Sequence, residues 1–239
     1  MSRRGALRAS IVLTCEHAGN RIPGELAQHF AGAEARAALD SHRGWDPGAL
    51  GLGKLMAKRL AVPLLSTPWS RLVVEANRSE HRPRIWSSFT AGLPAAERQR
   101  ILARYWRPHR KEVEAAIRAA IAKSRSVVHV AVHSFTPELD GEVRNADVAF
   151  LYDSSRRGEG ELARRWGERL RAVEPEVRVR NNYPYRGDTD GLPTALRKLH
   201  PAARYRGYEL EVNQALLAGP DWRRVGAALA TTLAEVLAP

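Results

Sequence analysis

Three apolar runs in this chain each end in residues that are able to do chemistry. The stretch Ser126–Pro137 (SVVHVAVHSFTP) begins with β-branched residues, and its apolar run ends at His133. Ser10–His17 (SIVLTCEH) and Arg206–Asn213 (RGYELEVN) have the same design. Continuous apolar runs are typical of strands buried on both faces of an α/β sheet, and open α/β sheets bind ligands at the carboxyl ends of such strands. We therefore expect these three strand ends to build one site.

The rest of the chain alternates between strand-like and helical patterns. Further short strands are expected at Val62–Ser66, Arg71–Ala76, Ala146–Tyr152 and Val177–Val179. Helices are expected at Ala31–Leu39, from Asp46-Pro47 to about Leu60, at Pro94–Lys123 with a break at Pro108, and at Glu159–Val173, Gly191–Leu199 and Pro220–Leu237. This alternation predicts an α/β fold with helices on both faces of the sheet. Because no repeat, linker or shift in composition interrupts it, we expect a single domain over residues 1–239.

Two loops are expected near the site. Asn77–Leu93 is polar and rich in arginine, and the segment NYPYRGDTDG is rich in turn formers and aromatic residues.

The composition limits the partners and the compartment. The formal net charge is +12 and the sequence pI is about 10.6, which permits nucleic acid, an anionic surface or a small acidic substrate as partner. A single cysteine, Cys15, allows no internal disulfide and favours a reducing compartment. Met1–Ser10 is basic, but the apolar run after it is too short for a signal peptide, and no run reaches the length of a membrane span. We therefore expect a cytoplasmic protein.

The strand ends carry candidate metal ligands. His17 and His133 each follow an apolar run, and two histidines, one carboxylate and an open position are typical of catalytic zinc sites. Zinc lowers the pKa of water, and a nearby carboxylate then takes the proton. Asp46 is the candidate oxygen ligand and Glu16 competes for this role, while Asp46 could instead be a plain helix N-cap.

Glu211 is the candidate general base. It lies one pleat from Glu209, so both side chains point to the same face of the expected strand. The alternative is a solvent-facing edge strand. His129 lies deeper in its strand than His133 and is expected to be structural.

Arginines near the ends of expected strands are candidates for binding a substrate carboxylate. Arg78, next to Asn77, could hold a carboxylate through two parallel hydrogen bonds, which lysine cannot do. Arg71, Arg144 and Arg186 are weaker candidates, and a solvated loop arginine is the alternative for each.

Six motifs occur in one order over most of the chain: CEHAGNRIP, DSHRGWDPGA, SRLVVEANR, VHSFTP, NNYPYRGDTDG and YELEVN. With this ordered set the chain resembles the N-formylglutamate amidohydrolase family. The resemblance implies a fold similar to that of zinc carboxypeptidases and other zinc exopeptidases, which is also called phosphorylase/hydrolase-like. This fold is a three-layer sandwich with a central mixed, mostly parallel sheet and helices on both faces. The resemblance also implies zinc ligation by His17 and His133, and a general base at Glu211.

The same resemblance implies a substrate site. Asn77 and Arg78 match the asparagine-arginine pair that holds the substrate carboxylate in carboxypeptidases, and Tyr185 and Arg186 look like pocket residues. The carboxypeptidase ligand glutamate has no counterpart, because Asn20 stands at that position. The third ligand is thus Asp46, in a tryptophan-aspartate element similar to the family's, with Glu16 and Asn20 as alternatives.

These features together predict a Zn²⁺-dependent amidohydrolase. The expected substrate is a small anionic N-acyl amino acid, N-formyl-L-glutamate or a related N-acyl acidic amino acid, and the expected products are formate and glutamate. Water would attack the formyl carbonyl while Glu211 accepts its proton. One alternative is a zinc carboxypeptidase or amidase acting on a peptide or a cell-wall fragment. A basic RNA-binding module ranks low, because no RNA-recognition motif is present and aromatic residues make up 7% of the chain.

Overall fold

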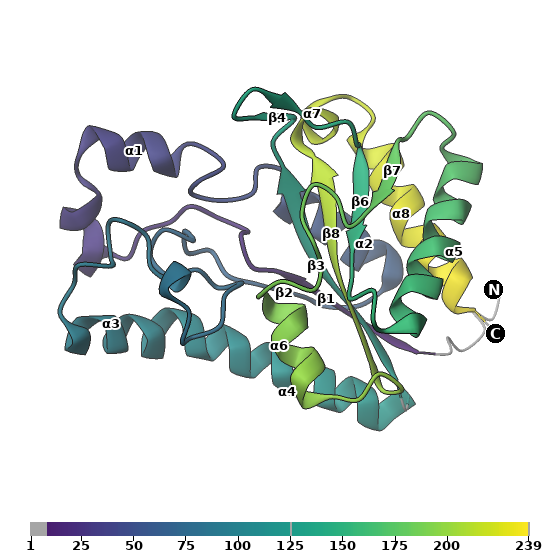
Figure 1. The fold of residues 1–239 in the computed structure, drawn as a ribbon, viewed down its shortest axis with the longest axis horizontal. Helices are drawn as coiled ribbons and strands as arrows, with labels where there is room; N and C mark the ends of the chain where they lie inside the picture. Colours follow the sequence, from purple (N-terminus) through teal and green to yellow (C-terminus); the bar gives the residue numbers. More distant parts are fainter. Residues whose placement is uncertain (1–8, 125, 239) are drawn as a thin grey trace.

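A six-stranded sheet forms the centre of the computed structural model, which describes residues 9–124 and 126–238 (Figure 1). The strand order is β2-β1-β3-β8-β6-β7. The strands are β1 (Ser10–Cys15), β2 (Leu64–Ser66), β3 (Val127–Phe135), β6 (Val148–Leu151), β7 (Val179–Asn181) and β8 (Tyr205–Asn213). Within this described sheet β6 pairs with β8 in the antiparallel sense, and the other pairs are parallel. The prediction of a mixed, mostly parallel sheet is confirmed.

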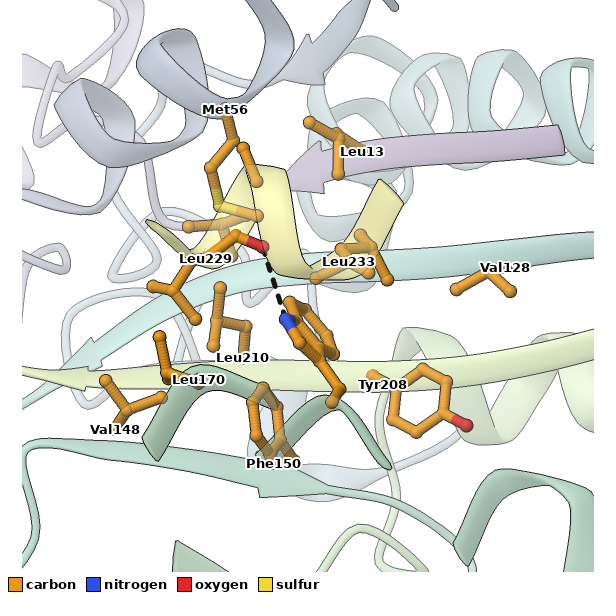
Figure 2. Close-up of a cluster of buried hydrophobic side chains, with 14 of the residues drawn as sticks. Leu13, Met56, Val128, Val148, Phe150, Leu170, Tyr208, Leu210, Leu229 and Leu233 are labelled. Atoms are coloured by element: carbon orange, nitrogen blue, oxygen red, sulfur yellow. Dashed lines mark hydrogen bonds between the residues drawn. The ribbon is translucent and has the colours of Figure 1, made fainter. Parts of the chain in front are cut away.

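One face of the sheet is covered by three helices, α2 (Ala49–Leu60), α5 (Arg157–Val173) and α8 (Trp222–Leu237). Figure 2 shows strand residues such as Val148 and Leu210 in one apolar cluster with Met56 of α2, Leu170 of α5 and Leu229 of α8. The indole of Trp166 is fully buried here and donates a hydrogen bond to the carbonyl of Leu229 at 3.2 Å. Large aromatic and aliphatic side chains therefore fill the space between sheet and helices.

The opposite face is covered by α4 (Arg107–Ser124) and α6 (Leu192–Leu199). Val113 and Ile117 of α4 and Leu196 of α6 pack against Val12 of β1 and Tyr205 of β8. Because both faces are covered, all nine residues of β3 are buried. This explains the continuous apolar run at this strand, and the predicted three-layer sandwich is confirmed.

The helical stretch before β3 changes its hydrogen bonding ahead of Pro108. It consists of α3 (Ala95–Ile101), a π-helical turn (Leu102–Trp106) and then α4. Proline lacks an N–H and its ring crowds the carbonyl four residues earlier, so a regular α-helix cannot pass through that position without adjustment. The predicted break therefore takes the form of a π-helical turn inside one long helical segment.

A second apolar cluster lies away from the sheet, toward α1 in Figure 1. It gathers the 3-10 helices Gly24–Phe30 and Pro83–Ile85, α1 (Ala33–Leu39), and α3. The predicted strand at Arg71–Ala76 is wrong, because this stretch forms turns and Val73 donates its N–H to Ser70 O at 2.9 Å. Its apolar residues Leu72, Val73 and Val74 are buried in this second cluster, so they need no place in the sheet.

The predicted helix start at Asp46-Pro47 is also wrong. Helix α2 begins at Ala49, its N-cap is Gly48 at φ +83°, and no side chain caps it. The side chain of Asp46 is buried and turned toward two histidines instead.

The short strand expected at Val177–Val179 begins two residues later, at Val179, because Val177 closes a turn onto Glu174 O.

Three small elements were not expected from the sequence. Strands β4 (Glu138–Leu139) and β5 (Glu142–Val143) form a hairpin after β3, and α7 (Gln214–Ala218) follows β8. The side chain of Asn213 caps α7 by accepting the N–H of Ala215 at 2.9 Å. Among the described helices, none has the length and apolar character needed to cross a membrane. Residues 1–8, which belong to the basic stretch considered for a signal peptide, lie outside the described residues.

Candidate metal centre and active site

The carboxyl ends of β1, β3 and β8 open into a cavity of about 800 Å³. His17 follows β1, His133 lies near the end of β3, and Glu211 lies near the end of β8. All three line the cavity, together with Asp46 from the loop before α2. The expectation that the three strand ends meet at one place is confirmed.

Two imidazoles converge on one carboxylate in this cavity. Oδ2 of Asp46 lies 3.2 Å from Nδ1 of His17 and 2.9 Å from Nδ1 of His133. One possible ligand atom from each of the three buried side chains lies within 4.8 Å of the others. The N–H of Ser134 also donates to Oδ2 of Asp46, at 3.3 Å. The arrangement has the composition of a centre for a divalent metal with nitrogen and oxygen ligands.

The outer nitrogen of each imidazole faces a different buried carboxylate. Nε2 of His17 contacts Oε1 of Glu75, and Nε2 of His133 lies 3.2 Å from Oε2 of Glu16. Histidines that bind metals usually donate their second N–H to a carboxylate or carbonyl, which fixes the tautomer and the ring orientation. The contact of His17 with Glu75 is such a hydrogen bond, whereas His133 and Glu16 form a close ion-pair contact that lacks hydrogen-bond geometry. The donor set therefore fits a bound metal, with both Nδ1 atoms on the metal side.

This geometry separates the three candidates for the oxygen ligand. Glu16 lies on the Nε2 side of His133, and its other neighbour is His109, at 3.5 Å. Asn20 donates its side-chain amide to Leu39 O at 3.1 Å and does not line the cavity. Among these three residues, Asp46 is the one that faces both Nδ1 atoms.

Burial and mutual contacts set the ionisation of the cluster. Burial by itself would raise the pKa of Asp46, but the imidazoles of His17 and His133 hold it below its usual range. Burial would lower the pKa of His133, but Asp46 and Glu16 raise it well above the usual value. Metal ligation requires neutral imidazoles, so a metal has to compete with protons at this centre.

Glu211 lies beside His133 in the sheet and pairs with it in the β3–β8 register. It is 7% exposed, and its Oε2 has no hydrogen-bond partner among the described residues. Burial raises the pKa of Glu211 to about 7, and the nearby carboxylates of Asp46 and Glu209 act in the same direction. A buried, unpaired carboxyl group with a pKa near neutrality is a candidate for proton transfer.

Glu209 lines the same cavity as Glu211, as the two-residue alternation of a strand predicts. Its Oε1 accepts a hydrogen bond from Nδ2 of Asn77 at 2.7 Å. Oδ1 of Asn77 in turn accepts the N–H of Leu192 at 2.7 Å. Asn77 therefore lies at the cavity wall with both ends of its amide already bonded.

The predicted arginines differ in their partners. Arg71 is held between Asp46, at 3.4 Å, and Glu75, at 2.6 Å. Arg78 lines the cavity, its Nη1 donates to Asp190 O, and none of the ion pairs in residues 9–124 and 126–238 involves it. Of these two arginines, Arg78 is the one that remains available to an anionic ligand.

The loop after β7 supplies another part of the wall. Tyr185, which is 44% exposed, and Arg186 both line the cavity. Arg186 is paired with Asp188 at 2.6 Å. Arg144 is not a lining residue, but its guanidinium lies 5.0 Å from the centre of the Tyr185 ring and donates to the Tyr185 hydroxyl at 2.9 Å.

Sequence reasoning gave no role to several residues of this site. Glu75 was assigned to a strand, although a carboxylate in the apolar run RLVVEA is costly to bury without a partner and could have indicated its bond to His17. Arg82 and Arg84 line the cavity from the loop after Arg78 and are exposed. No spacing in the sequence distinguishes these two from the other arginines of that loop.

His129, expected to be structural, lies inside the sheet and away from the cavity lining. Its ring nitrogens contact Thr14 Oγ1 at 2.9 Å and the hydroxyl of Tyr205 at 2.7 Å.

Cys15 is a buried free cysteine.

The candidate site lies at the carboxyl edge of a mostly parallel sheet, where α/β proteins bind their ligands. The family model for N-formylglutamate amidohydrolase matches residues 9–218, and the chain belongs to this family of amide hydrolases. The expected family resemblance is confirmed.

Two solved structures share the fold over nearly the whole chain. The gene product Atu2144 of Agrobacterium tumefaciens is 28% identical, with a TM-score of 0.76, and the match covers 98% of this chain and 91% of that one. An N-formylglutamate amidohydrolase from Ralstonia eutropha JMP134 is 20% identical, with a TM-score of 0.70, over 97% of this chain and 95% of that one. The comparison with curated proteins gave no match.

Proposed function

We propose that this protein is a zinc-dependent amidohydrolase that hydrolyses N-formyl-L-glutamate, or a related N-acyl acidic amino acid, to formate and L-glutamate. The observation that carries the proposal is the convergence of Nδ1 of His17, Nδ1 of His133 and Oδ2 of Asp46 beside Glu211, which has a carboxyl oxygen without a partner. Membership in a family of amide hydrolases supports the reaction class.

His17, Asp46 and His133 would hold the metal, while Glu75 and Glu16 lie against the outer nitrogens of the two imidazole rings. Zinc bound there would polarise the scissile carbonyl and lower the pKa of water. Two nitrogens and one carboxylate oxygen are a donor set that zinc accepts while keeping a position open for substrate.

Glu211 would do the proton chemistry. Its carboxylate takes a proton from the attacking water as the new carbon–oxygen bond forms, and it returns that proton to the nitrogen as the carbon–nitrogen bond breaks. A pKa of about 7 suits both halves of this task, because the group can start ionised and can also release the proton readily.

Arg78 would bind a substrate carboxylate. It lines the cavity without an ion-pair partner among the described residues, and a guanidinium binds carboxylate in a two-pronged geometry. Asn77 would shape the wall through its bonds to Glu209 and Leu192. Tyr185 and Arg186 would line the far part of the pocket, with Arg144 supporting Tyr185. Arg71 would act by holding Asp46 and Glu75.

We also propose that residues 1–239 act as one domain, since a single sheet collects strands from Ser10 to Asn213. We also propose that the protein acts in the cytoplasm and that its partner is a small anionic substrate. The alternative substrate is a peptide or a cell-wall fragment. The cavity of about 800 Å³ is large enough to hold part of such a substrate, so the assay includes a peptide. Membership in an amide hydrolase family supports a small-molecule substrate rather than RNA.

The decisive assay measures formate released by the purified protein, loaded with one equivalent of zinc, from N-formyl-L-glutamate. Chelated protein is the matched control, and the rate at which glutamate is released from a peptide that ends in glutamate tests the alternative substrate. We expect zinc-dependent release that is faster with N-formyl-L-glutamate than with the peptide. Faster turnover of the peptide would establish the alternative, and equal rates with and without zinc would contradict the proposed metal dependence.

A further inference from the structure

A second cavity, of about 390 Å³, lies between α4 and α6 and is lined by different residues from the main one. Trp106, Leu192, Leu196 and Leu199 give it an apolar wall, and Leu199 is 58% exposed. This volume is at the lower end of the range for small-molecule sites. A groove of this size suits a small molecule with an apolar part.

The cations that line this groove outnumber its carboxylates. The lining carboxylates are Glu80 and Glu114, and each is already paired with an arginine, Glu114 with Arg118. Arg107 lines it but is paired with Glu80, at 2.6 Å. Arg110, Lys111 and Lys198 also line it, and in the described part of the chain none of these three has an acidic partner within 4.0 Å. The groove therefore combines an apolar wall with unpaired cations.

Arg110 shows most clearly that a partner is missing. Its Nη1 is buried and has no hydrogen-bond partner among the described residues. Its Nη2 donates to Arg78 O at 3.1 Å, and its guanidinium carbon lies 4.8 Å from the centre of the Trp106 ring. A buried charged donor without an acceptor is costly, and Nη1 itself is enclosed by the protein. An anion in the groove would offset part of that cost through its charge, in addition to the carboxylates of Glu16, Asp190 and Glu75, which already act on this guanidinium.

The groove and the main cavity share one wall. Arg78 lines the main cavity with its side chain, while its carbonyl accepts hydrogen bonds from Nε1 of Trp106 and Nη2 of Arg110, both at 3.1 Å. Ser79 lines the groove and donates to the carboxylate of Asp190, which lines the main cavity. A ligand in the groove would therefore contact the residues that hold the wall of the active site.

We propose that the α4–α6 groove binds a small carboxylate with an aliphatic tail, and that its occupancy shifts the segment around Arg78 in the neighbouring cavity. The tail lies on Leu192, Leu196 and Leu199, and the carboxylate lies at Arg110. Lys111 and Lys198 add positive charge at the groove. Binding in the groove can be measured whatever the substrate or metal of the main cavity proves to be.

The test uses octanoate as the probe and the full chain labelled with ¹⁵N. Trp106 Nε1–H is an ideal reporter because it donates to Arg78 O, and its signal is identified among the six tryptophans by its loss in Trp106→Phe. We expect a saturable shift of the Trp106 indole signal and of the Arg78 backbone amide. Leu199→Glu and Lys198→Glu, both at exposed positions, should weaken binding about tenfold or more by adding negative charge.

Two controls locate the ligand. Lys123→Glu changes the same charge on α4 outside the groove lining, and it should bind octanoate as the wild type does. Octanol has the tail without the charge, and it should bind at least about tenfold more weakly.

Equal affinity in wild type, Leu199→Glu and Lys198→Glu would place the octanoate elsewhere and overturn the site. Equal binding of octanol would overturn the carboxylate assignment. The absence of a saturable Trp106 shift up to about 10 mM would overturn the proposal as a whole. A Trp106 shift without any change at Arg78 would overturn the coupling between the two cavities.

Discussion

At the scale of single residues, the candidate centre depends on which nitrogen of each histidine faces Asp46. Glu75 and Glu16 contact the two Nε2 atoms, which leaves both Nδ1 atoms toward the same carboxylate oxygen. All five side chains are buried, so none of these carboxylates is screened by bulk water. The hydrogen bond to Glu75 therefore orients the ring of His17 before any ligand binds, and the ring of His133 is oriented by its bond to Asp46.

The role of Asp46 as a metal ligand can be tested by mutation, because Asp46 is not the N-cap of a helix and its replacement does not remove a cap. Because α2 is not capped by a side chain and its N-cap residue is Gly48, Asp46→Asn should leave the helix intact. The substitution removes the charge that a divalent metal needs, so zinc affinity should fall by about 100-fold or more, beyond the 10–100-fold typical of losing an indirect partner. Zinc titration by calorimetry measures this. Unchanged zinc affinity would return the ligand role to Glu16.

Glu211→Gln separates proton transfer from metal binding. The amide keeps the shape of the side chain but cannot accept the proton, so kcat should fall by at least about 100-fold while zinc affinity and folding stay as in the wild type. Glu209→Gln is the matched control on the same face of β8, and it should lose less. Loss of zinc in Glu211→Gln would make Glu211 a ligand, and full turnover would place the base elsewhere.

Arg78→Lys keeps the positive charge but removes the planar fork. If Arg78 binds a substrate carboxylate, kcat/KM for N-formyl-L-glutamate should fall roughly tenfold or more. Arg84→Lys, at an exposed position on the same cavity, is the control and should change kcat/KM little. Wild-type kinetics in Arg78→Lys would assign the carboxylate to another cation.

At the scale of elements, the strands at the centre of the sheet were the easiest to predict. The runs at β1, β3 and β8 are apolar because helices cover both faces, and their burial follows the same pattern. The run RLVVEA has the same composition but forms turns in the second apolar cluster. The pattern of apolar residues cannot distinguish a buried strand from a buried turn, because the same side chains are buried in both.

A buried ion pair holds the loop after β7 in place. Arg197 of α6 lies 3.0 Å from Glu159 of α5 and also donates to Gly187 O of that loop at 2.6 Å. Glu159 accepts the N–H groups of Asp153 and Gly207 as well. The pair thus joins α5, α6, β8 and one wall of the cavity.

Arg197→Met should destabilise the protein by about 3–5 kcal/mol, because it leaves the carboxylate of Glu159 buried without its cation. Denaturant unfolding measures the change. Adding Glu159→Gln to Arg197→Met should recover part of the loss by removing that charge. Arg157→Met, which breaks the exposed pair with Glu161, is the control and should cost less than about 1 kcal/mol. Equal losses in Arg197→Met and Arg157→Met would show that the buried pair contributes little.

At the scale of the whole molecule, the fold class and the position of the site could be predicted because strand ends of an α/β sheet gather at one edge. His17, His133 and Glu211 were found by that rule. Glu75, Arg82 and Arg84 come from the irregular stretch after β2, whose path depends on packing against α1 and α3. No local pattern in the sequence predicts such a path. Only the carboxylate of Glu75 within an apolar run gave a hint, and Arg82 and Arg84 could be placed at the cavity only from the structure.

Some of the cationic side chains of this basic chain lie at the main cavity. Arg71, Arg78, Arg82, Arg84 and Arg186 line it, together with the carboxylates Asp46, Asp190, Glu209 and Glu211. Cations around a cavity raise the local concentration of anionic ligands and speed their association.

The central claim is that His17, Asp46 and His133 form one zinc centre, and the zinc content of the purified full-length protein tests it most directly. We expect about one zinc per chain in the wild type, in keeping with the one three-ligand cluster found among the described residues. His133→Ala, with folding checked by circular dichroism, should retain almost none, because two of its three ligands cannot close the site. Full zinc occupancy in folded His133→Ala would contradict the account.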